Sequence, residues 1–249
     1  EIMPSLVGSE MCIRDRFNAI IDMEYSKLER IILDQQEELE ALRTRSYCHR
    51  KEEQLIDLNS NLAQVIIGVR RSGKSTLCIN ALEHGKVHYA YVNFDDERLL
   101  SITIDDMDAI LETLYKVYGD FSYLLLDEIQ NVDGWHLFVN RMLRKQLHIV
   151  LTGSNSKLLS GELASHLTGR HHQIELLPFS FADFCAFRGV ATSPLTTKNR
   201  GLIAAAFDEY MRQGGFPELN NEKDWKSYID SLLNSIVRQD IQKRFKIKY

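Results

Sequence analysis

The chain has 249 residues, of which 44% are apolar and 26% are charged. This composition is typical of a globular protein with a full-sized core, and it excludes a disordered chain, a collagen-like rod and a disulfide scaffold. The 30 basic and 35 acidic side chains give a formal net charge of −5. The bulk charge therefore offers no general attraction to nucleic acid or to anionic membranes, and any such contact has to be local.

The four cysteines, Cys12, Cys48, Cys78 and Cys185, lie far apart and form no C-x-x-C pair. Their spacing favours free thiols in a reducing compartment over disulfide bridges or a zinc site. No apolar run approaches the roughly 20 residues that a membrane helix needs. We therefore expect a cytoplasmic protein that has no membrane partner.

The N-terminal part of the chain divides into two segments. Residues 1–22 begin with EIMPSLVGSEMCIRDR, which has no regular period and no signal-peptide order, so we expect a leader that is disordered or non-native. Residues 23–58 form the next segment, where apolar residues at helical spacing predict an amphipathic helix packed on the main domain. A partner-binding helix is the alternative. The apolar positions are Leu28, Ile32, Leu39 and Leu42.

A glycine-rich motif follows an apolar run at residues 62–68, whose β-branched composition predicts a buried strand. The motif has the pattern G-x-x-x-x-G-K-S, called Walker A, and a helical pattern over residues 74–82 follows it. Its glycines let successive N–H groups face a phosphate, and the helix N-terminus adds partial positive charge. The expected nucleotide contacts are Gly68, Val69, Arg70, Arg71, Ser72, Gly73, Lys74, Ser75 and Thr76.

Three side chains of this motif have specific expected roles. Lys74 bridges the β- and γ-phosphates, Ser75 places its hydroxyl on Mg²⁺, and Thr76 contacts the α-phosphate. The alternative is a chance glycine turn between a strand and a helix. The strand before the motif and the helix after it favour nucleotide binding.

A second apolar strand ends in two carboxylates at residues 123–128, in the manner of a Walker B motif. Asp127 would hold Mg²⁺ through water, and Glu128 would polarise the attacking water as the general base. The chain between the two motifs leaves room for a strand at 87–94 and a helix at 104–118. A buried strand that runs into an acidic turn would give the same pattern, but the two motifs together favour a phosphate and metal site.

A polar turn follows the next candidate strand, at residues 148–152. In open α/β sheets, ligands lie at the carboxyl edge of the strands. Asn155, or else Ser154, is therefore expected to contact the γ-phosphate or its attacking water as a sensor. A solvated turn explains these residues equally well.

Several runs resemble bacterial and archaeal AAA-like P-loop ATPases: GVRRSGKSTL, YAYVNFDDERLL, YLLLDEIQNVDGW, IVLTGSNSKLLSGELASHLTGRH, IELLPFSF, YMRQGGFPEL and IVRQDIQKRFKIKY. The resemblance covers residues 23–249. It implies an α/β fold of the AAA/ASCE-like P-loop NTPase type, with a mainly parallel sheet at 59–178 and a small helical lid at 179–249. It also implies that a further C-terminal domain of unknown function is absent, so that this chain is truncated.

The resemblance adds a role for Arg170, in the run Leu167-Thr-Gly-Arg170. In similar ATPases an arginine here reaches the γ-phosphate of a neighbouring subunit, where it neutralises charge during phosphoryl transfer. A structural arginine that pairs with an acidic residue is the alternative. A homo-oligomer is thus left open as a partner, and so is DNA, although the net charge does not support it.

These motifs, with the resemblance, predict Mg²⁺-dependent ATP binding and hydrolysis, with ATP and Mg²⁺ as cofactors; ATP over GTP is what the resemblance implies. The catalytic candidates are Glu128, Lys74, Arg170 and Asn155, and the metal candidates are Ser75 and Asp127. The nucleotide state would be coupled to the absent C-terminal domain or to a partner. The alternative function is a nucleotide-gated binding module with negligible turnover, associated with DNA or not.

Overall fold

The computed structural model describes residues 26–44, 47–154, 167, 169–221 and 224–237. Its centre is a five-stranded sheet in the spatial order β2-β3-β4-β1-β5, and all neighbouring strands are parallel. The strands are β1 (Ala63–Gly68), β2 (Tyr89–Asn93), β3 (Tyr123–Asp127), β4 (His148–Ser154) and β5 (His171–Glu175). The expected α/β class with a mainly parallel sheet is confirmed.

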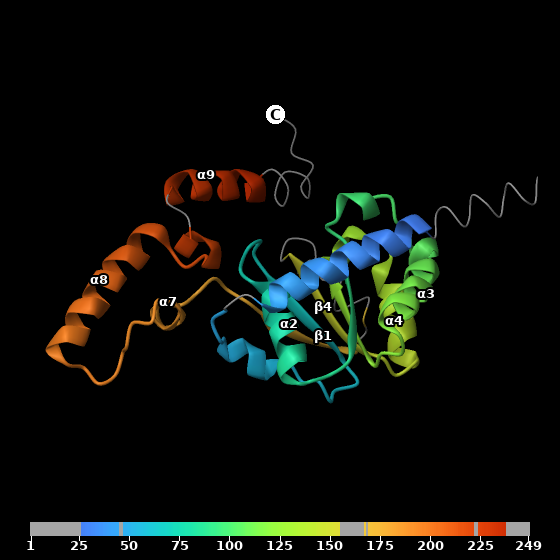
Figure 1. Ribbon diagram of the computed structural model, residues 1–249, viewed down its shortest axis with the longest axis horizontal. Helices are drawn as coiled ribbons and strands as arrows, with labels where there is room; N and C mark the ends of the chain where they lie inside the picture. Colours follow the sequence, from blue (N-terminus) through green and yellow to red (C-terminus); the bar gives the residue numbers. More distant parts are fainter. Residues whose placement is uncertain (1–25, 45–46, 155–166, 168, 222–223, 238–249) are drawn as a thin grey trace, which may run out of the picture.

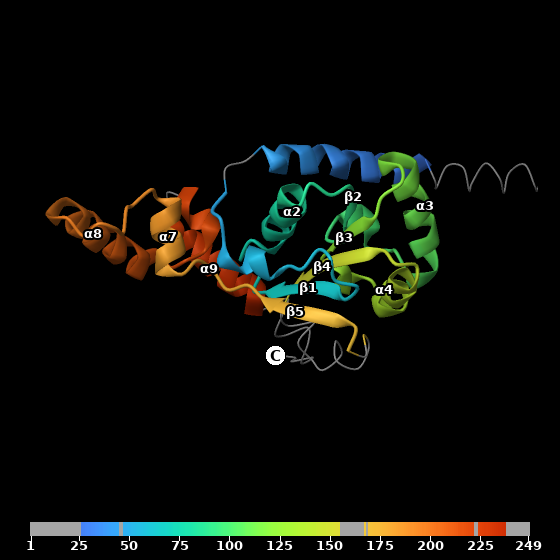
Figure 2. The ribbon, with the colours of Figure 1, turned by 90° about the horizontal axis from the view of Figure 1, so that it is seen from below.

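Helices cover both faces of the sheet (Figures 1 and 2). Helix α2 (Lys74–His84) packs on one face, against side chains such as Ile66 and Val150. Helices α3 (Met107–Tyr118) and α4 (Trp135–Arg144) pack on the other face. Because successive side chains of a strand point to opposite faces, the central strands need apolar residues at nearly every position. This explains the unbroken apolar runs of the sequence.

A helix over residues 26–43 lies along the β2 edge of the sheet and touches both apolar cores. Ile32 and Leu39 are fully buried there, which confirms the predicted packing of this helix on the main domain. Gln35 accepts a hydrogen bond from the Asn93 N–H at 2.9 Å and donates one to the Asn93 carbonyl at 3.0 Å. Gln35 thus satisfies edge-strand groups that would otherwise be open to pairing with another chain.

The C-terminal helices are α7 (Phe181–Phe187), α8 (Thr197–Gln213) and α9 (Trp225–Ser235), with a 3₁₀ turn at Pro217–Asn221. They lie beyond the carboxyl end of β5 (Figure 2). Phe184, Cys185 and Ala206 form a small core of their own. Helix α7 was not predicted, although Ser180 and Asp183 form the capping box at its start.

A short connector joins β5 to these helices. The Leu176 N–H donates to the Ile67 carbonyl at 2.7 Å, and the Phe179 N–H donates to the Gly215 carbonyl at 2.7 Å. A Cβ on Gly215 would lie 2.1 Å from the Phe179 carbonyl oxygen, so only glycine fits this approach. The connector is therefore anchored to the sheet at one end and to the helices at the other.

No helix within the described ranges is both long and apolar enough to cross a membrane.

Candidate functional site

The Walker A motif forms the loop between β1 and α2, as predicted. Two of its residues have positive φ angles, 64° at Arg71 and 94° at Gly73, which curl the backbone over the start of α2. Gly73 is the N-cap of the helix and has no side chain to cap it. The N-terminal amides of α2 therefore face an open position that suits a phosphate group.

Lys74 lies beneath this loop and is only 4% exposed. Its ammonium group donates to the Val69 carbonyl at 3.3 Å and lies 3.4 Å from a carboxylate oxygen of Glu128. A buried ammonium group needs nearby acceptors to offset the loss of hydration. In this arrangement Lys74 links the phosphate loop to the end of β3.

Ser75 and Asp127 meet at the same place, since the Ser75 hydroxyl donates to Asp127 Oδ1 at 2.9 Å. Asp127 also accepts hydrogen bonds from Thr152 and, at 3.4 Å, from the Tyr91 hydroxyl. Burial raises the pKa of Asp127 above its ordinary value, although the hydrogen bond from Thr152 opposes the shift. A buried carboxylate beside a hydroxyl is a hard oxygen donor set, and it fits Mg²⁺.

Glu128 follows Asp127 with a left-handed backbone conformation, at φ 51°. Its N–H donates to the Thr152 hydroxyl at 3.1 Å, and its carboxylate accepts a hydrogen bond from Gln130. A non-glycine residue in this region of φ is held there by its surroundings, and such residues cluster at functional sites. The Glu128 carboxylate consequently turns toward Lys74 at the carboxyl edge of the sheet.

Thr152 is a functional residue that the sequence analysis missed. It is fully buried on β4, and its hydroxyl donates to Asp127 while accepting from the Glu128 N–H. One side chain thereby sets the positions of both acidic residues. Its signal in the sequence is a hydroxyl residue at the end of an otherwise apolar strand.

The predicted sensor residue Asn155 lies outside the described residues. Its neighbour Ser154 ends β4 and is buried, in register with Gly68 of the phosphate loop. The end of β4 is therefore adjacent to the loop. The sensor role itself stays a prediction.

Arg170 lies far from the phosphate loop of its own chain. Its carbonyl accepts from the Ala63 N–H at 3.0 Å, at the start of β1, so roughly 17 Å of strand separates it from Gly68. The arginine is exposed and has no ion-pair partner among the described residues. The structure therefore does not bring Arg170 together with Lys74 and Glu128 within one chain.

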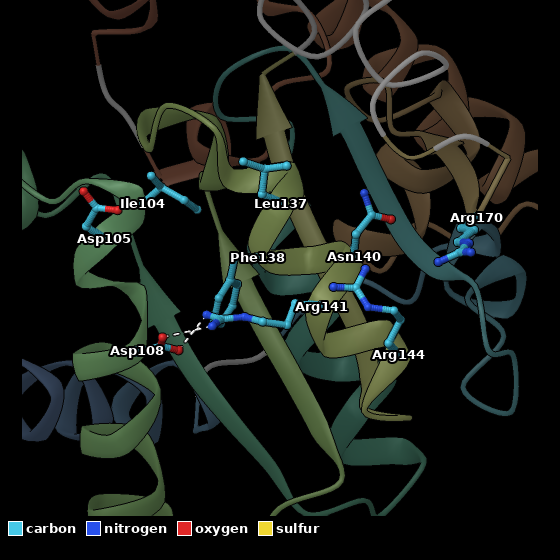
Figure 3. A pocket seen from close by; sticks show the side chains of 9 residues that line it. All are labelled: Ile104, Asp105, Asp108, Leu137, Phe138, Asn140, Arg141, Arg144 and Arg170. Carbon is cyan, nitrogen blue, oxygen red and sulfur yellow. Dashed lines mark hydrogen bonds and ion pairs between the residues drawn. The ribbon is translucent and has the colours of Figure 1, made fainter.

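Arg170 borders a surface pocket of about 630 Å³ between α3 and α4 (Figure 3). Asn140 and Arg144 of α4 lie on the same side of this pocket as Arg170. Across the pocket, Arg141 of α4 forms an ion pair with Asp108 of α3 at 2.6 Å. Arg144 and Arg170 thus give a cationic rim to a face away from the phosphate loop.

A second pocket, of about 200 Å³, lies beside the phosphate loop. Its walls come from three parts of the chain that are far apart in sequence. The Ser72 hydroxyl and the Asn80 amide nitrogen are buried in this wall and have no hydrogen-bond partner among the described residues. The other lining side chains include Leu42, Tyr47, Arg50, Phe179, Phe187 and Pro217. The sequence analysis missed this pocket.

The phosphate loop also contacts the C-terminal helices directly. Arg71 forms an ion pair with Glu218 at 2.7 Å, and its guanidinium carbon lies 5.2 Å from the centre of the Tyr228 ring. The Tyr228 hydroxyl donates to Glu218 at 2.5 Å. Burial, with the neighbouring carboxylate, raises the pKa of Tyr228 to about 12, so the phenol keeps its proton at neutral pH. We call Arg71, Glu218 and Tyr228 the loop latch.

The fold and the site define a P-loop nucleotide-binding protein of the α/β class. A family model described as AAA domain matches residues 60–185. Uncharacterized protein MJ1544 of Methanocaldococcus jannaschii is 33% identical over 94% of this chain and 52% of its own length. An uncharacterized protein of Haemophilus influenzae is 32% identical over 79% of this chain and 50% of its own. The chain belongs to this AAA domain family, which confirms the resemblance.

The chain spans about half the length of these curated relatives. Among solved structures, the Walker-type ATPase PABY2304 of Pyrococcus abyssi aligns with a TM-score of 0.44 and 17% identity, over 76% of this chain and 72% of that one. AMPPCP-bound DnaA from Aquifex aeolicus aligns with a TM-score of 0.39 and 16% identity, over 83% and 63% of the two chains.

Proposed function

We propose that this protein binds ATP together with Mg²⁺ and hydrolyses it. The observation that carries the proposal is the meeting of Lys74, Ser75, Asp127 and Glu128 at the uncapped start of α2. An ammonium group, a hydroxyl, a buried carboxylate and a second carboxylate are the groups that phosphoryl transfer requires. They come from the start of α2 and the end of β3, so they are held on rigid elements.

Each residue has a separate part in the proposed reaction. Lys74 and the amides of the loop bind the β- and γ-phosphates. Ser75 and Asp127 would hold Mg²⁺, which neutralises phosphate charge when it is bound. Glu128 leaves Lys74 when phosphate takes its place, and it then accepts a proton from the attacking water. Thr152 orients Asp127 and Glu128 and does not touch the nucleotide.

The pocket beside the loop is the proposed position of the base. Phe179 and Phe187 offer aromatic surface, and the Asn80 amide offers a hydrogen bond to a ring nitrogen or oxygen. Binding of the base there would bring the helix over residues 26–43, α2 and the C-terminal helices into contact with one ligand. We propose that the nucleotide state reaches the rest of a longer protein through these C-terminal helices.

Arg170 is proposed to act on the nucleotide of a neighbouring copy. Its exposure and its place at the opposite edge of the sheet support a role between chains and argue against one within a chain. A cationic rim with Arg144 would face the neighbour's γ-phosphate. The observed lack of an ion-pair partner among the described residues gives no support to the alternative of a structural arginine.

A nucleotide-gated binding module is the second candidate function. It is favoured by the contact between Glu128 and Lys74 and by the hydrogen bond from Gln130, which hold the proposed base in a resting position. In this case ATP would bind, but turnover would wait for a partner or for DNA.

Phosphate release from Mg-ATP tests the two candidates. The wild type should release phosphate at a rate per chain that rises with protein concentration, and Glu128→Gln should bind ATP without turnover. Arg170→Ala should lower turnover without lowering ATP affinity, and mixing it with Glu128→Gln should restore part of the rate. Tight binding without turnover in the wild type would support the binding module, with added duplex DNA showing whether nucleic acid is the missing activator.

A further inference from the structure

Two histidines and one glutamate meet on the surface at the far end of α2. His84 is the last residue of α2. His49 lies just before the 3₁₀ turn Lys51–Leu55, and Glu53 lies within that turn. One ligand atom from each residue lies within 4.8 Å of the other two. The cluster joins two segments of the chain and lies away from the phosphate loop.

Glu53 is the centre of this cluster. Its carboxylate is hydrogen-bonded to His84 Nδ1, and its second oxygen lies 3.7 Å from His49 Nδ1. The two imidazole rings stack, with centroids 5.2 Å apart and planes inclined by 18°. The Glu53 side chain is only 13% exposed, whereas those of His49 and His84 are 73% and 51% exposed. A fixed carboxylate thus lies beneath two accessible imidazoles.

This donor set fits a borderline divalent metal ion. Two imidazole nitrogens and one carboxylate oxygen are ligands that Zn²⁺ uses in proteins, with water completing four-coordination. Mg²⁺ and Ca²⁺ prefer oxygen ligands alone, so the cluster differs in kind from the Ser75 and Asp127 site.

Tyr47 supports the two imidazoles from one side. Its hydroxyl lies 3.0 Å from His84 Nε2 and 3.2 Å from His49 Nδ1. While His84 Nδ1 faces Glu53, the His84 Nε2–H can donate to the Tyr47 oxygen, and this hydrogen bond would orient the ring for an ion bound at Nδ1.

We propose that His49, Glu53 and His84 form a binding site for one divalent transition-metal ion of the Zn²⁺ type. The ion would tie the end of α2 to the segment that carries Tyr47 and Arg50, both of which line the pocket beside the phosphate loop. The site stands independently of ATP hydrolysis, because none of its three residues belongs to the proposed catalytic set.

The test is a metal titration of the untagged chain in excess Mg²⁺. Zn²⁺ affinity is measured by competition with a chromogenic chelator, and Co²⁺ binding by its visible absorbance. We expect one tight equivalent, and a loss of about 10-fold or more in affinity for each of His49→Ala, His84→Ala and Glu53→Gln. His88→Ala is the matched control, since His88 is also exposed and its Nδ1 is hydrogen-bonded to the Asp120 carbonyl at 2.8 Å, away from the cluster.

Cys48→Ser is a second control. The Cys48 thiol lies 3.6 Å from both the His49 and the Asp183 carbonyls and is not one of the three clustered donor groups, so it should take no part in binding. Zn²⁺ should also raise the melting temperature of the wild type, but not that of the double variant His49→Ala/His84→Ala. Equal metal affinity in the wild type and the double variant, or loss of binding in Cys48→Ser, would overturn the proposal. A network of hydrogen bonds alone would give the first of these results.

Discussion

Replacing Thr152 by valine should destabilise the protein although the two side chains have nearly the same shape. Thr152 is fully buried, and its hydroxyl donates to the carboxylate of Asp127 and accepts from the Glu128 N–H. A hydrogen bond to a charged group contributes about 1.5–3 kcal/mol to stability, and a buried amide left without an acceptor adds to the loss. We therefore expect Thr152→Val to lower the free energy of unfolding by roughly 2–3 kcal/mol.

The assay is urea unfolding at neutral pH without nucleotide, with Thr113→Val as the matched control. Thr113 is also buried, but its hydroxyl donates to the Ala109 carbonyl within α3. That carbonyl belongs to a helix, so the control should lose well under about 1 kcal/mol. Phosphate release should fall as well in Thr152→Val, because both acidic residues lose their common partner. Equal unfolding free energies for the two valine variants would refute the reasoning.

Three further predictions follow from the site and the connector. Burial raises the pKa of Asp127, so Asp127→Asn should stabilise the nucleotide-free protein at pH 7 by on the order of 1 kcal/mol. This gain should shrink as the pH falls through the folded pKa and should be lost only below the unfolded pKa of about 3.9, where Asp127 becomes protonated in both states; a gain that grows on acidification would contradict it. Gly215→Ala forces the new Cβ against backbone atoms and should lower the unfolding free energy by roughly 1–3 kcal/mol. Gly201→Ala in α8 places its Cβ in open space and should raise the unfolding free energy by up to about 1 kcal/mol. Thermal melts that rank these two variants in the reverse order would show that the connector is looser than described. Glu218→Gln should weaken the contact with Arg71, which is half exposed and contributes at most about 1 kcal/mol. A fluorescent ATP analogue should therefore dissociate up to about fivefold faster in stopped flow. An unchanged dissociation rate would show that the loop latch does not affect nucleotide binding.

The parts of the site that the sequence predicted are those built from adjacent residues. The phosphate loop and the acidic pair each follow a buried strand, so a local pattern determines both their conformation and their chemistry. The parallel sheet follows from the apolar runs, since strands covered on both faces carry apolar residues at nearly every position. The role of Arg170 toward a neighbouring chain, which the resemblance implies, stays a prediction; within its own chain the arginine lies at the start of β1, away from the phosphate loop.

The missed parts depend on contacts between distant segments. Arg71 meets Glu218 at a separation of 147 positions in the sequence, and no local pattern reports that pairing. The pocket beside the loop likewise forms only after Tyr47, Asn80 and Phe179 have been brought together by the fold. Helix α7 was missed for a different reason: it has seven residues, too few for a helical period to stand out.

The connector between β5 and the C-terminal helices limits how those helices can turn. Only Leu177 and Pro178 lie between the two backbone anchors at Leu176 and Phe179, and Arg50 donates to the Leu177 carbonyl at 3.0 Å. The ring of Pro178 fixes its own φ, so a rotation has very few dihedral angles available to it. A rotation of the C-terminal helices at this connector is therefore restricted.

Such a rotation would affect two contacts at once. Phe179 forms part of the wall of the pocket beside the phosphate loop, and Glu218 of the loop latch lies on the same side of the connector. A rotation that moves one away from α2 moves the other away from Arg71. Opening of the pocket and release of the latch should therefore occur together.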